Sequence, residues 1–126
     1  MAELLPDFYK VITTEQVNET DWVVLVALNP QHAIYSGHFP QQPVVPGVCI
    51  LQMIKECVES ICRAALQYKQ IASCKFLAAI NPNETPEIKF SLTIKNGEVN
   101  TRHILVEGAS SKNDICIKLK AQLTER

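Results

Sequence analysis

The sequence lacks an excess of either charge. Twelve basic residues face thirteen acidic ones, for a formal net charge of -1, and no block of like charges occurs. An electrostatic footprint for nucleic acid or an anionic membrane is therefore missing. Apolar runs of roughly 20 residues, the length of a membrane-spanning helix, are also missing. Segment 1–10 has no basic-then-apolar layout of a secretory signal, so we expect a cytoplasmic protein with neither nucleic-acid nor membrane partners.

The sequence also lacks paired cysteines. Its five cysteines are odd in number, include no CxxC and lie in apolar surroundings: Cys49, Cys57, Cys62, Cys74 and Cys116. A zinc site uses close cysteine or histidine pairs, and a disulfide framework uses an even set in a secreted chain. We therefore expect free, mostly buried thiols and no metal site.

What is present is an ordinary globular composition, with 126 residues of which 47% are apolar and 20% charged. This length and composition predict a single domain, residues 1–126, with enough apolar side chains for one core. Runs rich in β-branched residues predict about six mostly antiparallel strands. Their expected ranges are Leu5–Gln16, Asp21–Leu28, Ile71–Leu77, Glu87–Ile94, Glu98–Glu107 and Ile115–Leu123, the fourth and fifth joined by a hairpin signal at Asn96-Gly97.

A loop and a helix fill the middle of the chain. Segment 31–47 holds three prolines and is predicted to be a rigid, extended loop. The segment from Gly47 to about Tyr68 has no proline or internal glycine, and its polar residues fall within an arc of about 140° on a helical wheel. The rest of the wheel is apolar, which predicts a central helix wrapped by the sheet.

The junction between this loop and helix resembles a known active-site segment. Residues 37–52 read GHFPQQPVVPGVCILQ. This run resembles the pattern of the 3-hydroxyacyl-acyl carrier protein dehydratases of the FabZ and FabA type, and segment 71–82 (IASCKFLAAINP) resembles a strand of the same family. The resemblance implies an α+β hotdog fold, with one long helix wrapped by an antiparallel sheet. The matching positions are His38, Phe39, Pro40, Pro43, Pro46 and Gly47.

The resemblance also implies roles for individual residues. His38 would remove the C2 proton of a 3-hydroxyacyl thioester, and the backbone N–H groups of Gly47 and Val48 would bind the thioester oxygen at the helix N-terminus. The family places a carboxylic acid fourteen residues after the histidine, and here that position holds Gln52. An amide does not deliver a proton near neutral pH. Losing a general acid lowers a rate by about 10²–10⁴, so dehydratase activity would be impaired.

Four further residues have two interpretations each. Glu56, one helical turn after Gln52, is either a substitute acid acting through water or a solvated residue in a charged stripe. Tyr35 and Phe39 either line an acyl tunnel or pack the loop. Cys49 is either a nucleophile near a helix N-terminus or a buried packing residue, and the resemblance favours packing because the family has an aliphatic side chain there.

The resemblance implies a homodimer, or a larger homo-oligomer, whose site forms between protomers. It implies an acyl carrier protein or coenzyme A thioester as substrate, within fatty-acid or related lipid or polyketide biosynthesis, and no metal or redox cofactor. Because the net charge is near zero, carrier docking would use a local patch such as Arg63, Lys69 or Lys75. Three functions remain open: an impaired dehydratase, a non-catalytic acyl-thioester binding module, and an acyl thioesterase that uses Glu56.

Overall fold

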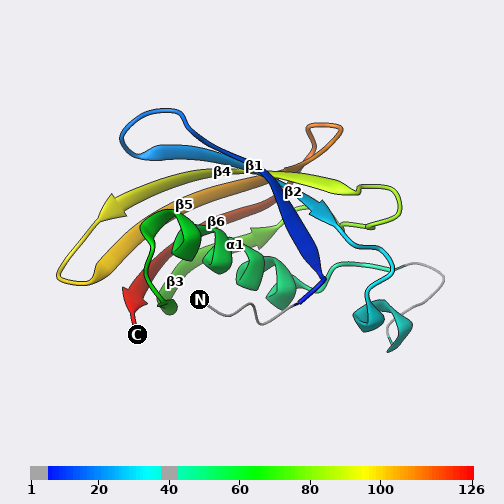
Figure 1. Ribbon diagram of the computed structural model, residues 1–126, viewed down its shortest axis with the longest axis horizontal. Coiled ribbons are helices and arrows are strands. Elements are labelled where there is room, and N and C mark those ends of the chain that lie inside the picture. The colour runs from blue at the N-terminus through cyan, green and yellow to red at the C-terminus, as the bar shows by residue number, and fades with distance from the viewer. Residues whose placement is uncertain (1–5, 38–42) are drawn as a thin grey trace.

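The computed structural model describes residues 6–37 and 43–126, which form one helix and one six-stranded sheet (Figure 1). The helix α1 spans Gly47–Cys62 and is preceded by a short 3₁₀ turn, η1, at Ala33–Gly37. The strands are β1 Tyr9–Gln16, β2 Asp21–Leu28, β3 Leu66–Phe76, β4 Glu87–Asn96, β5 Thr101–Ser110 and β6 Ile115–Glu125. The predicted architecture, one long helix against a six-stranded antiparallel sheet, is confirmed.

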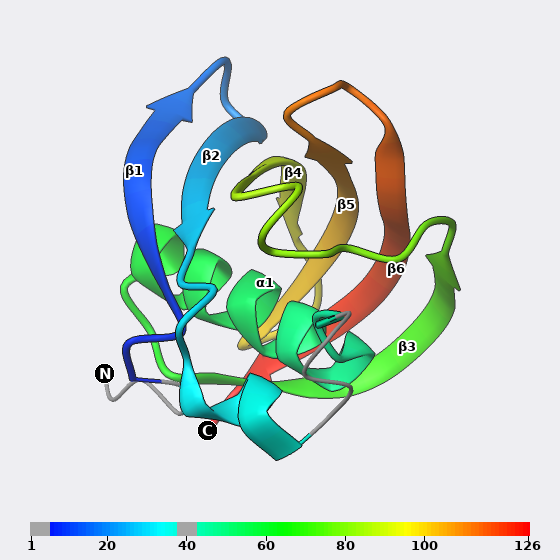
Figure 2. The same cartoon turned by 90° about the vertical axis from the view of Figure 1, so that its right-hand side faces the viewer.

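The strands follow the order β1-β2-β4-β5-β6-β3, and each neighbouring pair is antiparallel. Figure 2 shows the sheet curled around α1, with β1 and β3 at its two edges. The strand that follows α1 in the chain therefore pairs with the last strand. Because the sheet curls, several of its strands can pack against a helix whose apolar face is wide.

The core lies between the concave face of the sheet and α1. On β2 the burial alternates as a half-buried strand requires, since Val24, Val26 and Leu28 are buried. The helix contributes Ile50, Met53, Ile54, Cys57 and Val58 to the same cluster, and β4, β5 and β6 contribute Ile88, Phe90, Leu92, Ile104, Val106, Ile117, Leu119 and Leu123.

The prediction that the helix continues to about Tyr68 is wrong. The helix ends at Cys62, and Arg63 takes a left-handed conformation with φ 55° and ψ 45°. The N–H of Leu66 then donates to Glu59 Oε2 over 2.8 Å, while Lys55 Nζ donates to Leu66 O over 3.3 Å. Helical side chains thus bind the backbone of Leu66, whose own side chain enters the core as β3 begins.

This arrangement also corrects the expected solvated stripe of the helix. Lys55 and Glu59 are buried, at 8% and 2% exposure, and their charged groups lie 3.4 Å apart. The guanidinium of Arg126 lies 3.3 Å from Glu59 Oε2. A buried carboxylate with two cations and a backbone N–H around it has the partners that burial demands. The polar arc of the helix therefore includes charges that hold the chain reversal in place.

Two other expectations, on the thiols and on the β4–β5 hairpin, are confirmed. All five cysteines are free, with Cys49, Cys57 and Cys116 buried and the other two partly exposed. The β4–β5 hairpin forms at the predicted place, although its left-handed residue is Asn100, at φ 61°, and β5 starts at Thr101 rather than Glu98. Within the described residues, no helix is both long and apolar enough to cross a membrane.

Candidate functional site at the start of the helix

The first turn of α1 presents backbone donors without a side-chain cap. Pro46 occupies the position before the helix in an extended conformation, and it has no side chain able to accept from the helix. The carbonyl of Pro46 accepts from the N–H groups of Cys49 and Ile50, at 3.0 and 3.2 Å. The N–H groups of Gly47 and Val48 precede these first intrahelical bonds and lie at the positive end of the helix dipole. They have the chemistry of an anion or oxyanion site.

The side chain of Phe76 on β3 approaches Gly47 closely. A Cβ atom added at this position would lie 2.8 Å from Cζ of Phe76, inside van der Waals contact. The Phe76 ring, half exposed, thus lies over the start of the helix. Glycine at position 47 keeps the backbone accessible beside this ring. Val48, in turn, is 74% exposed, so its side chain leaves the first turn open.

Gln52 and Glu56 form a hydrogen-bonded pair on the helix. Gln52 Nε2 donates to Glu56 Oε2 over 2.8 Å. The other oxygen of Glu56, Oε1, accepts from the hydroxyl of Tyr9 on β1 over 2.7 Å. Both side chains are half-buried. Glu56 is therefore not the solvated residue of a charged stripe, because both of its oxygens accept hydrogen bonds inside the protein.

A cavity of about 270 Å³ lies next to this pair, between β1 and the helix. Tyr9 and Glu56 line it together with Val11, Thr14, Val24, Cys57, Glu59 and Ser60. Tyr9 is the residue that sequence reasoning missed. It lies 47 positions before Glu56, and no spacing rule connects two residues that meet only because β1 folds over the helix.

Tyr35, predicted to line an acyl tunnel, lies in η1 and is 5% exposed. Its ring stacks on that of Phe8, with centroids 6.0 Å apart. The hydroxyl is buried and has no hydrogen-bond partner among the described residues. Burial, and secondarily the neighbouring Cys49, raises the pKa of Tyr35 to about 12. Burial also raises the pKa of Cys49, which favours its interpretation as a packing residue over a nucleophile.

Two predicted site residues, His38 and Phe39, lie outside the described residues, so their roles stay predictions. Of the others, the structure brings Gln52 and Glu56 together and places Gly47 and Val48 at the start of the same helix. Among the described residues, no group of three or more histidine, cysteine, aspartate and glutamate side chains could hold a metal ion.

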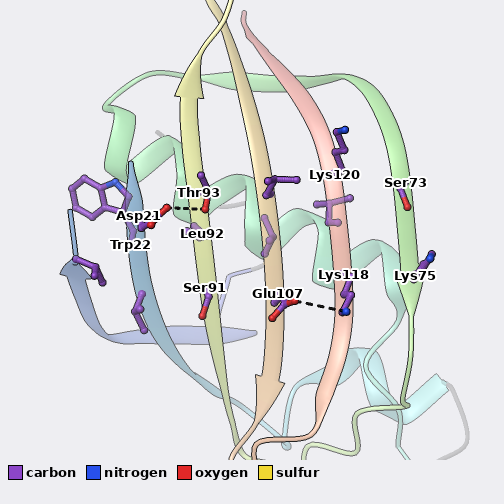
Figure 3. A pocket seen from close by; sticks show the side chains of 15 residues that line it. Asp21, Trp22, Ser73, Lys75, Ser91, Leu92, Thr93, Glu107, Lys118 and Lys120 are labelled. Atoms are coloured by element: carbon purple, nitrogen blue, oxygen red, sulfur yellow. Dashed lines mark hydrogen bonds and ion pairs between the residues drawn. The ribbon is translucent and has the colours of Figure 1, made fainter. Parts of the chain in front are cut away.

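A larger cavity, of about 570 Å³, lies on the outer face of the sheet, and none of the described residues that line it is a predicted catalytic residue. Figure 3 shows this face, with α1 on the far side of the sheet. Lys75, one of the cations suggested for carrier docking, lines it beside Lys118 and Lys120 of β6. Lys118 lies 3.8 Å from Glu107. The described residues predicted for catalysis and thioester binding, which are Gly47, Val48, Gln52 and Glu56, belong to α1 on the other side of the sheet.

Comparison with known proteins identifies the class of this fold. The ApeI:P dehydratase heterocomplex from Xenorhabdus doucetiae superposes with a TM-score of 0.73 at 17% identity, covering 92% of this chain and 97% of that one. A hypothetical thioesterase with coenzyme A from Streptococcus pneumoniae gives 0.65 at 11% identity, with coverages of 94% and 85%. The chain has the hotdog fold, as predicted.

Sequence comparison then gives the family. Residues 14–114 match the model of the ApeI-like family, described as ApeI dehydratase, and the chain belongs to that family. It is 26% identical over 111 residues to the 3-hydroxyacyl-[acyl-carrier-protein] dehydratase FabZ of Lactococcus lactis, covering 80% of this chain and 74% of that protein. The FabZ of Agrobacterium fabrum is 26% identical over 124 residues, covering 86% and 79%. The predicted relationship to FabZ-type dehydratases is confirmed.

Proposed function

We propose that the protein acts on 3-hydroxyacyl thioesters of an acyl carrier protein as a dehydratase whose acid step is weakened. The observation that carries this proposal is Gln52 in the second turn of α1, one turn beyond the uncapped N–H groups of Gly47 and Val48. In the resembling dehydratases the corresponding position holds the acid. The FabZ relatives, which are named as 3-hydroxyacyl-[acyl-carrier-protein] dehydratases, support the substrate class.

The reaction would have two steps, removal of the C2 proton and protonation of the departing C3 hydroxyl, and the site would assist the first better than the second. His38 takes the C2 proton, and the electron pair of that bond moves to the thioester, whose oxygen is stabilised by the N–H groups of Gly47 and Val48. The C3–O bond then breaks, and the departing hydroxyl must gain a proton to leave as water. Gln52 can hydrogen-bond this hydroxyl but has no proton to give near neutral pH. Water would supply that proton, at a rate lower by about 10²–10⁴ than a positioned acid.

A second candidate is a non-catalytic binding module for acyl thioesters. The observation that favours it is the engagement of Glu56, whose two oxygens already accept hydrogen bonds from Tyr9 and Gln52. A carboxylate held in this way is poorly placed to protonate a leaving hydroxyl. The same engagement weakens the thioesterase alternative, since activating a water would require Glu56 to exchange one of these bonds for a bond to that water.

The assembly and location belong to the same proposal. A homodimer would let His38 of one protomer face Gln52 of its partner, as the resemblance implies. The name of the similar ApeI:P heterocomplex supports association between hotdog chains. Five free thiols fit the reducing cytoplasm. A coenzyme A carrier remains the alternative to acyl carrier protein.

Turnover of a 3-hydroxybutyryl thioester, on acyl carrier protein and on coenzyme A, tests the proposal. We expect slow formation of the 2,3-unsaturated thioester, abolished in His38→Ala. Saturable binding without any change of the acyl group would replace the dehydratase with the binding module. Release of free thiol that is lost in Glu56→Gln would instead establish a thioesterase. Absence of both binding and turnover with either carrier would reject the proposed function.

A further inference from the structure

The hydrogen bond between Gln52 and Glu56 fixes which end of the Gln52 amide faces Glu56. Gln52 turns its NH₂ toward Glu56, because Nε2 donates to Glu56 Oε2 over 2.8 Å. The carbonyl oxygen, Oε1, then points to the other side. The Gln52 bond to Glu56 is the one hydrogen bond that this side chain makes within the described residues. The site is thereby given an acceptor at the position where the related dehydratases have an acid.

Tyr9 restrains Glu56 in turn. Its hydroxyl donates to Oε1 over 2.7 Å, which leaves Oε2 toward Gln52. The contact joins β1 to the helix across 47 positions of sequence, so it is held by the fold and not by local helix geometry. A carboxylate with a donor on each oxygen has fewer rotamers open to it than one with a single partner. Glu56 is therefore held in an orientation that keeps its hydrogen bond to Gln52.

We propose that Tyr9 and Glu56 are positioning residues that lock the Gln52 carbonyl toward the ligand, so that the site selects an acyl chain bearing a C3 hydroxyl. This inference rests on the proposed function, because it assumes that an acyl thioester lies beside Gln52. A hydroxyl donates to the locked carbonyl. A 3-oxo group only accepts hydrogen bonds, so it cannot form one with Oε1, which is also an acceptor. An acyl chain without oxygen at C3 leaves Oε1 without a hydrogen bond.

The expected selectivity follows from one hydrogen bond. A ligand hydroxyl that satisfies a half-buried acceptor should bind about 10-fold tighter than the same chain without the hydroxyl. The 3-oxo chain should bind no better than the unsubstituted chain.

If Glu56 is replaced by glutamine, the neighbouring amide both donates and accepts. The side-chain amide of Gln52 can then rotate so that its NH₂ faces the ligand. In that orientation the NH₂ donates a hydrogen bond to a 3-oxo group, and in the original orientation the carbonyl accepts one from a hydroxyl.

The test uses three ligands that the protein does not turn over: pantetheine amides of 3-hydroxybutyrate, butyrate and 3-oxobutyrate, titrated calorimetrically. The variants are Glu56→Gln and Tyr9→Phe. Tyr68→Phe is the matched control, since the Tyr68 hydroxyl donates to Leu51 O on the same helix over 2.7 Å. We expect the 10-fold hydroxyl preference in wild type and Tyr68→Phe, about 3-fold or less in Glu56→Gln, and an intermediate value in Tyr9→Phe.

The outcomes separate this inference from the proposed function. Binding of all three amides without a hydroxyl preference in wild type overturns the inference alone. A preference that survives in both folded variants, Glu56→Gln and Tyr9→Phe, also overturns it. If Glu56→Gln does not fold, Tyr9→Phe decides the question by itself. Failure of the wild-type protein to bind any of the three amides or the corresponding thioesters rejects the proposed function, and the inference with it.

Discussion

Gln52 and Glu56 stand one helical turn apart and share a 2.8 Å hydrogen bond. Amide and carboxylate thus occupy neighbouring positions on one face of the helix. The carboxylate side is tied to β1 through Tyr9. The pair is therefore held to β1 as well as to the helix.

Replacing Gln52 by glutamate should restore the acid. The new carboxyl would lie within hydrogen-bond distance of Glu56, and two such groups disfavour double ionisation, so the pair should retain one proton near neutral pH. We expect dehydration of a 3-hydroxybutyryl thioester to accelerate by about 10²–10⁴. Gln52→Ala is the control and should show no gain. An unchanged rate in Gln52→Glu would remove the acid position from the mechanism.

Removing the Tyr35 hydroxyl should stabilise the protein while weakening ligand binding. The hydroxyl is buried with no hydrogen-bond partner in residues 6–37 and 43–126, and a buried unpaired hydroxyl lowers stability by about 1–3 kcal/mol. Tyr35→Phe should raise the free energy of unfolding in urea by about 1 kcal/mol. If Tyr35 lines the acyl tunnel, the same variant should bind 3-hydroxybutyryl pantetheine amide less tightly. Higher stability with unchanged affinity would make Tyr35 a packing residue only.

Breaking the buried charge cluster at the end of α1 should be strongly destabilising. Glu59→Gln leaves Lys55 buried without its counter-charge, and uncompensated buried charges lower stability by about 3–5 kcal/mol. Glu107→Gln, which removes an exposed ion pair with Lys118, should lower it by less than about 1 kcal/mol. Urea unfolding of both variants gives the comparison. Equal losses of unfolding free energy in the two variants would mean that the buried cluster stabilises the protein no more than an exposed ion pair does.

Alkylation by iodoacetamide should discriminate among the five thiols. Burial, and secondarily the charge of Glu56, raises the pKa of Cys57 to about 12, so its thiolate fraction at pH 8 should be about a thousandth of that of an ordinary thiol. Cys62 and Cys74 are partly exposed and should react first. In urea all five should react at similar rates. Mass spectrometry of digests would give the order, and early modification of Cys57 would contradict the packing described above.

Asp21 should contribute to stability against acid. Hydrogen bonds from Asn18 first, then Thr93, lower the pKa of Asp21 below its usual 3.8. Because the folded pKa is the lower one, the contribution is fully present above about pH 4 and is lost as the pH falls through the folded pKa. Asp21→Asn should therefore flatten the fall of unfolding free energy between pH 4 and pH 2, measured in urea. A steeper fall of the unfolding free energy in the variant would contradict a stabilising contribution from ionised Asp21.

The fold was largely predictable because its signals are local and periodic. The alternation on Asp21–Leu28 and the apolar helix beginning at Gly47 each specify a buried face, and two such faces have few ways to cover one another. The end of the helix was not predictable. Nothing in its composition stops it at Cys62, since the reversal depends on Glu59 and Lys55 binding the backbone of Leu66.

The candidate site was predictable where a spaced motif carried it. Gly47 and Gln52 follow from the resemblance, and the structure places both at the start of α1. The engagement of Glu56 was not predictable, because its partner Tyr9 reaches it through tertiary structure. The charge pattern indicated that Glu56 is a solvated residue, whereas both of its oxygens accept hydrogen bonds. Its role as a substitute acid stays a prediction.

The position of β3 has a consequence for the order in which the chain can fold. β3 follows α1 directly in the chain, yet within the described residues it pairs only with β6, so Leu66 meets Glu125. Until β6 has formed, β3 has no ladder partner, and the β3 side of the helix stays uncovered. Such long-range pairing slows folding and exposes apolar surface meanwhile. On a ribosome, closure of the sheet must therefore wait for the last strand to emerge.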